Sequence, residues 1–155
     1  MKIGWVSASP IARTGYGRET REIGYRLIDF GFDVTFIGTF GDVVIWGGVT
    51  EQETFLGKKA TILVLTDSQS APDVIGTYIR KFGFQALVGF MDCFGLEFMN
   101  KVEGAPVIGY IPIDGPYTAK MRDNVKNFYK VVAYSKFGYR ELQKWYSPSK
   151  ISYIP

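Results

Sequence analysis

The first 40 residues contain the pattern that most restricts the fold: an apolar strand, an amphipathic helix and a second apolar strand. Residues 2–8 (KIGWVSA) are short, apolar and followed by Ser-Pro, which is typical of a buried strand. Residues 17–30 predict a helix, with Gly31 as its cap, and residues 33–39 (DVTFIGT) predict the second strand. The expected buried face of that helix consists of Thr20, Ile23, Gly24, Leu27 and Ile28. Such a β-α-β unit implies parallel strands.

The rest of the chain continues the alternation of strands and helices. Residues 41–60 predict short strands around a Gly-Gly turn. Further strands are expected at 60–66, 86–91, 106–113, 130–135 and 150–155, and further helices at 72–82, 117–128 and 137–146. Most of these strands are continuously apolar, as in a parallel sheet that is buried on both faces. The sequence therefore predicts an α/β fold with a doubly wound, mostly parallel, Rossmann-like sheet.

Composition bounds the class of protein and the chemistry available to it. The chain has 155 residues, 46% of them hydrophobic and 21% charged, which fits one globular domain. A single cysteine, Cys93, excludes an internal disulfide, and no apolar run is long enough for a signal peptide or a membrane span, so we expect a cytoplasmic protein. The absence of histidine excludes Ser-His-Asp and Cys-His mechanisms and the usual zinc sites within this chain, and no metal is expected.

Charge is distributed unevenly along the chain. Residues 116–155 hold eight basic and two acidic residues, a net charge of +6, whereas the first 115 residues carry −3. One interpretation is a solvated face, in which Tyr139, Leu142 and Tyr146 pack inward. The other is peripheral docking of this basic, aromatic segment on an anionic membrane. Nucleic acid is not expected as a partner, because no RNA- or DNA-binding motif is present.

The loop after the first strand (ARTGYGR) is the first candidate site. Gly15 and Gly17 lie where a helix begins, where free N–H groups and the helix dipole favour an anion, and Arg13 adds positive charge. The dinucleotide fingerprint G-x-G-x-x-G is incomplete, because Thr20 replaces its last glycine, and this disfavours a nicotinamide-dependent oxidoreductase. Two interpretations stay open: a phosphate-binding turn, or a strand–helix connection that merely needs glycine.

Two acidic residues follow other expected strands. Asp92 lies in MDCFG (91–95) and Asp114 in IPIDGP (111–116). Ligands of open parallel sheets bind outside the carboxyl ends of the strands, where a carboxylate can orient a sugar hydroxyl. The alternative is a carboxylate that caps a turn or helix, which is common for aspartate.

Four segments together resemble a known family. They are KIGWVSASPIARTGYGRETREIGYRLIDFGFDVTFIG, QALVGFMDCFG, PVIGYIPIDGP and KVVAYSKFGYRELQKWYSPSKISYIP. The chain resembles the N-terminal domain of retaining glycosyltransferases of the GT-B type, the group 1 glycosyl transferases. The last segment is the most specific, with a strand ending in Ser, an amphipathic helix and a strand ending in Ile-Pro. The resemblance covers nearly all of the chain, least well residues 41–59.

The resemblance implies half of a two-domain enzyme, residues 1–155 being its acceptor-side, Rossmann-like domain. Such enzymes move a sugar from a nucleotide-sugar donor to a sugar or lipid-linked acceptor, with retention, in a cleft between two domains, and they need no cofactor. Their C-terminal, donor-binding domain carries a Glu-x7-Glu motif, and no pair of glutamates in this chain has that spacing. The donor-binding domain is therefore expected to be absent from this chain, and the isolated domain to be inactive. The alternative function is a non-catalytic Rossmann-like module that binds a nucleotide or phosphate.

The family also implies roles for particular residues. Asp114 falls where many relatives have a histidine in the cleft that contacts the transferred sugar, so it is the expected catalytic residue, although Asp departs from the family pattern. The residues expected to contact the donor phosphates or sugar are Arg13, Gly15, Tyr16 and Gly17. Those expected on the acceptor side of the cleft are Asp92, Ser135 and Lys136.

Overall fold

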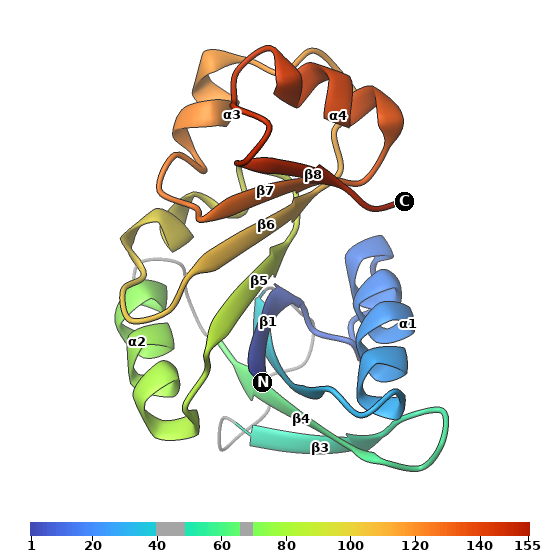
Figure 1. Cartoon of the computed structure of the whole chain (residues 1–155). Coiled ribbons are helices and arrows are strands. Elements are labelled where there is room, and N and C mark those ends of the chain that lie inside the picture. Colours follow the sequence, from blue (N-terminus) through green and yellow to red (C-terminus); the bar gives the residue numbers. More distant parts are fainter. Residues whose placement is uncertain (40–48, 66–69) are drawn as a thin grey trace.

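The computed structural model describes residues 1–39, 49–65 and 70–155 (Figure 1). The strands in these ranges are β1 (Lys2–Ala8), β2 (Asp33–Thr39), β3 (Val49–Glu53), β4 (Lys59–Val64), β5 (Ala86–Phe90), β6 (Val107–Ile111), β7 (Lys130–Ala133) and β8 (Ile151–Tyr153). They form one sheet in the order β3-β4-β2-β1-β5-β6-β7-β8. Every neighbouring pair runs parallel except β3 and β4, which are antiparallel. The predicted mostly parallel sheet is confirmed.

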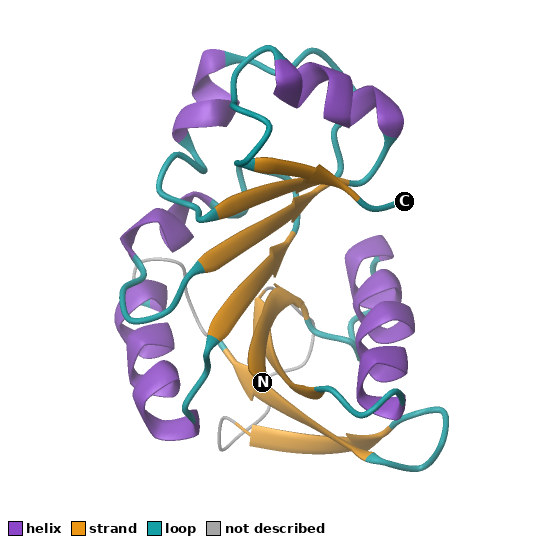
Figure 2. Cartoon of the chain, in the orientation of Figure 1, coloured by secondary structure: helices purple, strands orange, loops and turns teal. Residues whose placement is uncertain are grey.

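Helices cover both faces of the sheet (Figure 2). They are α1 (Gly15–Asp29), α2 (Ala71–Phe82), the short 3-10 helix η1 (Glu97–Lys101), α3 (Ala119–Asp123) and α4 (Lys136–Gln143). Adjacent residues of a strand point to opposite faces, so Trp5 packs in the cluster beneath α1 while Val6 packs in the cluster beneath α2. The central strands β1, β5 and β6 are buried on both faces, and their sequences are almost continuously apolar, as the doubly wound prediction requires.

Helix α1 begins two residues earlier than the sequence pattern indicates. Thr14 is its N-cap, and the Thr14 hydroxyl accepts a hydrogen bond from the amide of Gly17 at 3.0 Å. The expected face is the buried one, with Thr20, Gly24 and Ile28 fully covered. Gly24 must be small, because a Cβ there would lie 2.3 Å from the Phe36 ring of β2. This close approach lets α1 pack tightly on the sheet.

Three local differences from the sequence prediction occur in the second half of the chain. The helix expected at 117–128 is reduced to α3, and tight turns follow it that bring Val125 and Phe128 into the core. The helix expected at 137–146 ends at Gln143, and η1 was not expected. In the first case, the buried side chains of Val125 and Phe128 recur at a spacing that a turn satisfies as well as a helix does. Across the described residues, no helix combines the length and apolar character needed to span a membrane.

Strand β3 falls in the region predicted as short strands, residues 41–60, and it pairs antiparallel with β4, which corresponds to the strand expected at 60–66. The turn between them is tied to the end of α1, where the Lys58 ammonium donates to the carbonyl oxygens of Ile28 at 3.2 Å and Asp29 at 2.8 Å. A cation there satisfies free carbonyl groups and complements the helix dipole. The remainder of that prediction, residues 41–48 with the Gly-Gly turn, lies outside the described residues.

Candidate functional site

The sheet has a topological switch point between β1 and β5. The chain leaves β1 through α1 on one face and enters β5 from α2 on the other face, although the two strands are neighbours. Ligands of doubly wound proteins bind in the crevice that this reversal leaves at the carboxyl ends of the strands. Gly15, the first residue of α1, and Phe90, the last residue of β5, both line a hollow at this edge.

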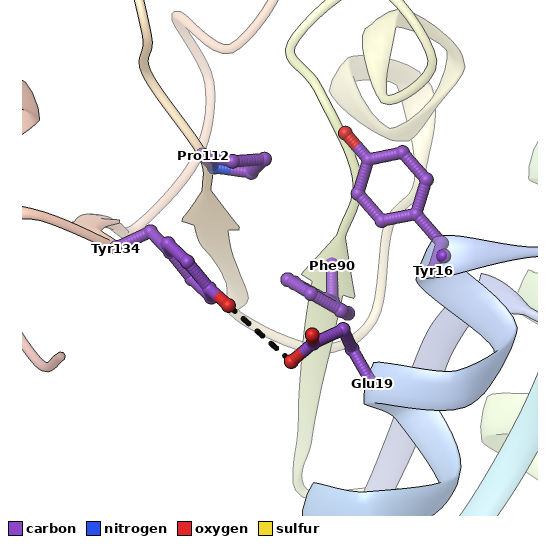
Figure 3. Close-up of a pocket in the computed structure, with 6 residues that line it drawn as sticks. Tyr16, Glu19, Phe90, Pro112 and Tyr134 are labelled. Carbon is purple, nitrogen blue, oxygen red and sulfur yellow. Dashed lines mark hydrogen bonds between the residues drawn. The ribbon is translucent and has the colours of Figure 1, made fainter.

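This hollow has a volume of about 380 Å³ and is drawn in Figure 3. One side is formed by the start of α1, through Gly15, Tyr16 and Glu19. The other side is formed by three successive strand ends: Phe90 ends β5, Pro112 follows β6, and Tyr134 follows β7. Figure 3 shows Tyr16 and Tyr134 on opposite sides of Phe90, with Glu19 projecting from the helix towards Tyr134.

Aromatic rings form most of the lining. The Tyr16 ring meets Phe90 edge-on at a centroid distance of 5.5 Å, and Tyr134 stacks with Phe90 at 6.3 Å. Beneath them, Tyr110 of β6 stacks on Phe90 at 5.2 Å. Phe90 itself is only 1% exposed, so the rings around it fix its position as the floor of the hollow.

One polar pair crosses the hollow from α1 to β7. The Tyr134 hydroxyl donates a hydrogen bond to Oε2 of Glu19 at 3.3 Å. Burial raises the pKa of Tyr134 above its ordinary value, and the negative charge of Glu19 raises it further. An Arg18 guanidinium nitrogen lies 3.9 Å from the other Glu19 oxygen and balances part of its charge. The hollow therefore contains a carboxylate that is held in place but still faces solvent.

A buried hydrogen-bond chain supports the hollow from below. The Thr20 hydroxyl of α1 donates to the Ser7 hydroxyl of β1 at 2.8 Å, and Ser7 donates to the carbonyl oxygen of Phe90 at 2.6 Å. Thr20 stands where the dinucleotide fingerprint would have its last glycine. The side chain that breaks that fingerprint thus links α1, through β1, to the end of β5.

The two glycines of the first loop differ in their surroundings. A Cβ at Gly17 would lie 2.4 Å from the carbonyl oxygen of Ala12 and 2.8 Å from that of Ser9, whereas a Cβ at Gly15 would meet nothing within 4 Å. Gly17 is therefore required for packing of the loop against the helix. Gly15 borders open space at the helix N-terminus, where an anion can approach the backbone. Contacts of either glycine with a donor stay a prediction.

Tyr16 connects the hollow with the two predicted aspartates. Burial is the main cause of its raised pKa. The Asp92 carboxylate raises it further, the Asp92 backbone amide opposes the rise, and the Asp114 charge adds to it. The pKa of Tyr16 thus depends on the charges of both aspartates. Arg13 is exposed on the loop that precedes α1, and it is not part of the lining of the hollow.

Asp92 has a structural task in the turn after β5. Its Oδ1 atom accepts hydrogen bonds from the backbone amides of Phe94 at 3.0 Å and Gly95 at 2.9 Å. This is the turn-capping arrangement that the sequence left open as the alternative. A contact between the other carboxylate oxygen of Asp92 and an acceptor stays a prediction.

Asp114 is exposed on the loop between β6 and α3, and the neighbouring Tyr117 anchors that loop. The Tyr117 amide donates to Oε2 of Glu141 at 3.1 Å, and Trp145 donates its indole N–H to the Tyr117 carbonyl at 3.0 Å. The Tyr117 hydroxyl also pairs with that of Tyr146 at 3.2 Å. The position of Asp114 therefore depends on α4 and the turn that follows it.

Ser135 and Lys136 lie at the carboxyl end of β7. Ser135 is the N-cap of α4, and its hydroxyl accepts a hydrogen bond from the amide of Gly138 at 3.0 Å. Lys136 is the first residue of α4 and is exposed. Neither lines the hollow, so the structure does not bring them together with Gly15 and Tyr16. Their role on the acceptor side stays a prediction.

Four residues that line the hollow were not among the predicted site residues. They are Glu19, Phe90, Pro112 and Tyr134. A signal for three of them was present, because each stands at or directly after the carboxyl end of a predicted strand. Glu19 had no such signal, since a glutamate on the polar face of an amphipathic helix is ordinary. Within the described ranges, no cluster of three or more acidic or cysteine side chains is placed to hold a metal ion.

Comparison with known proteins bears on the fold. No protein-family profile and no curated protein sequence matches the chain. Among solved structures, it matches a chain of sucrose-phosphate synthase from Thermosynechococcus elongatus, with a TM-score of 0.67 and 13% sequence identity. The match covers 100% of this chain and 88% of that one. The chain thus shares the α/β, Rossmann-like fold of that sucrose-phosphate synthase chain, which confirms the predicted fold class.

Proposed function

We propose that this chain is the acceptor-side domain of a retaining glycosyltransferase, which moves a sugar from a nucleotide-sugar donor to a sugar or lipid-linked acceptor. The main support for this proposal is the aromatic hollow at the switch point. Gly15, the first residue of α1, lines this hollow, so the hollow borders the N-terminus of the helix. A sugar site and an anion site are then neighbours. The glycosyltransferase-like fold supports the same assignment.

In the proposed reaction, the bond between the donor sugar and the phosphate oxygen breaks while the acceptor hydroxyl attacks the same face of the sugar. The hydroxyl proton passes to the departing phosphate, so the protein need not supply a base. Negative charge grows on that phosphate, and the free N–H groups at the start of α1 stabilise it. Asp114 accepts a hydrogen bond from a hydroxyl of the transferred sugar. A second domain supplies the nucleotide pocket.

The second candidate function is a non-catalytic nucleotide- or phosphate-binding module. The structural roles of Asp92 and Ser135 favour it, since they leave fewer of the predicted acceptor-side residues free to bind an acceptor. Calorimetric titration of the 155-residue chain with UDP, GDP and ADP separates the two. The transferase proposal expects weak binding of each nucleotide, because the nucleotide pocket belongs to the other domain. Micromolar binding of one of them establishes the module instead.

A peripheral membrane contact is a further part of the proposal. Lys136, Arg140 and Lys144 are exposed on α4 and its end, while Leu142 of the same helix is buried. This arrangement agrees with the solvated-face interpretation. Exposed Phe137 and Trp145 nevertheless lie among these cations, which is the combination that anionic lipid surfaces attract. A lipid-linked acceptor would then be reached from the membrane surface.

A further inference from the structure

We infer that the hollow between α1 and the ends of β5, β6 and β7 binds a pyranose ring, the acceptor sugar of the proposed transfer. This inference rests on the proposed function and adds the class of ligand and the residues that recognise it. The hollow measures about 380 Å³, within the usual range for small-molecule sites of roughly 300–1,000 Å³.

The lining matches the two kinds of surface on a sugar. The faces of a pyranose carry C–H groups and are apolar, whereas its rim carries hydroxyls. Tyr134 and Pro112 offer flat apolar surfaces on the strand side of the hollow, beside the buried ring of Phe90, and Tyr16 closes the helix side (Figure 3). A ring that enters between Tyr16 and Tyr134 covers these surfaces, which removes apolar area from water on both partners.

Glu19 provides the polar recognition at the rim. A carboxylate accepts about four hydrogen bonds. One of these comes from the Tyr134 hydroxyl, and the Glu19 side chain remains 34% exposed. Two neighbouring hydroxyls of a sugar donate to the remaining acceptor positions, while the oxygen of Tyr134 accepts from a third. Charge-assisted hydrogen bonds of this kind are the stronger ones, and they orient the ring.

The local charges favour a neutral polyol over an organic cation, which aromatic rings and a carboxylate also attract. Arg18 lies 3.9 Å from Glu19 and competes for its charge. The N-terminus of α1 carries partial positive charge and opens into the same hollow at Gly15. A cation would meet both, whereas sugar hydroxyls are not repelled.

The hollow is also held in place before any ligand arrives. The hydrogen-bond chain from Thr20 through Ser7 to Phe90 connects its two sides below the floor. The Glu19–Tyr134 hydrogen bond connects them at the rim. Fewer side chains then have to be ordered on binding, which lowers the entropic cost of holding a small neutral ligand.

The experiment is a titration of the ¹⁵N-labelled chain followed by NMR, with no nucleotide sugar present. The probes are the methyl glycosides of glucose, galactose, mannose and N-acetylglucosamine, with tetramethylammonium chloride as the cationic probe. At tens of millimolar, at least one glycoside should shift the amide signals of Gly15, Glu19 and Tyr134. Glu19→Gln and Tyr134→Leu should each weaken its binding about tenfold. Glu22→Gln, one turn further along α1 and outside the lining of the hollow, should bind as the wild type does.

Two results overturn the inference. One is that no glycoside shifts these signals, or that the shifts arise at other residues. The other is that tetramethylammonium binds more tightly than every glycoside, which makes the hollow an aromatic cage for cations. The titration contains no donor, so a negative result excludes the sugar site but does not test the proposed transfer reaction. That reaction is tested separately, by measuring turnover.

Discussion

The hydroxyl of Tyr134 donates a hydrogen bond to Glu19 at 3.3 Å, joining residues that are 115 positions apart in the sequence. Glu19 lies on the first helix and Tyr134 follows the seventh strand, so this contact closes the hollow across the switch point. The ionisation of Tyr134 can therefore be used to follow the state of the hollow.

The first prediction concerns the ionisation of Tyr134. Its pKa is raised first by burial and then by the charge of Glu19. In Glu19→Gln the charge is removed and burial remains, so the pKa of Tyr134 should fall towards 10 without reaching it. NMR titration of tyrosine labelled at Cζ follows the individual ring. The same pKa in the variant and the wild type would mean that the two groups are not coupled in solution.

The two glycines of the first loop should respond differently to substitution. Gly17→Ala should lower the free energy of unfolding by about 1–3 kcal/mol, because its Cβ would meet two backbone oxygens. Gly15→Ala should change it by less than about 1 kcal/mol, since Gly15 borders open space. Urea unfolding measures both values. Equal losses in the two variants would contradict the packing role of Gly17.

The buried hydroxyls beneath the hollow should behave as one unit. Ser7→Ala leaves the Thr20 hydroxyl and the Phe90 carbonyl without their partner, at a cost of about 2 kcal/mol. Thr20→Val removes the same Thr20–Ser7 bond, so the double variant should lose less stability than the sum of the single losses. Chemical unfolding of the three variants completes the cycle. Strictly additive losses would show that the two hydroxyls do not interact.

Glu141 should make the anchoring of the Asp114 loop sensitive to acid. The Lys144 ammonium is the main cause of its lowered pKa, and the Tyr117 amide contributes. A carboxyl whose pKa is lower in the folded state stabilises the fold at pH values above its ordinary pKa, here 4.5. This contribution to the free energy of unfolding is lost as the pH falls through the folded-state pKa.

Wild-type protein should therefore lose more stability than Glu141→Gln when the pH is taken from neutral to below that ordinary value. Urea unfolding at the two pH values provides the comparison. The exposed Glu97→Gln variant is the control and should follow the wild type. If Glu141→Gln and the wild type lost equal free energy of unfolding, Glu141 would not anchor the loop.

Membrane contact through α4 has its own test. Co-sedimentation with vesicles of phosphatidylglycerol should exceed that with vesicles of phosphatidylcholine, and salt should weaken it. Replacing Lys136, Arg140 and Lys144 by glutamine should abolish the difference, whereas replacing the exposed Lys2, Lys81 and Lys101, on other elements, should preserve it. Equal sedimentation with both lipids, or none with either, would end this proposal and leave a solvated face.

Much of the fold was predictable from local patterns. The boundaries of β1 and β2 agree with the prediction, because each is an apolar run with clear turn residues at its ends. Helix α1 showed its buried face through periodicity. The shortened α3 was missed, because Val125 and Phe128 reach the core through turns, and sequence spacing does not separate that case from a continuing helix.

The site was only partly predictable, for a reason that lies in sheet geometry. Local sequence identified Gly15 and Tyr16, since a glycine-containing turn before a helix has a known use. The Glu19–Tyr134 pair depends on which strands are neighbours in the sheet. The strand order is a property of the whole sheet, and no local sequence pattern predicts it. For Gly17 and Asp92 the sequence allowed either a ligand contact or a structural role, and the structural role was established only by the loop geometry around them.

The proposed transfer is best tested by release of nucleoside diphosphate from UDP-, GDP- and ADP-sugars. The assay uses protein expressed from the complete gene, so that any domain beyond these 155 residues is present. We expect release with at least one donor and a loss of at least about tenfold in Asp114→Asn, for which removal of one transition-state contact suffices. Asp123→Asn, on a neighbouring exposed element, should keep the wild-type rate. No release with any donor, or wild-type rates in Asp114→Asn, would contradict the proposed site.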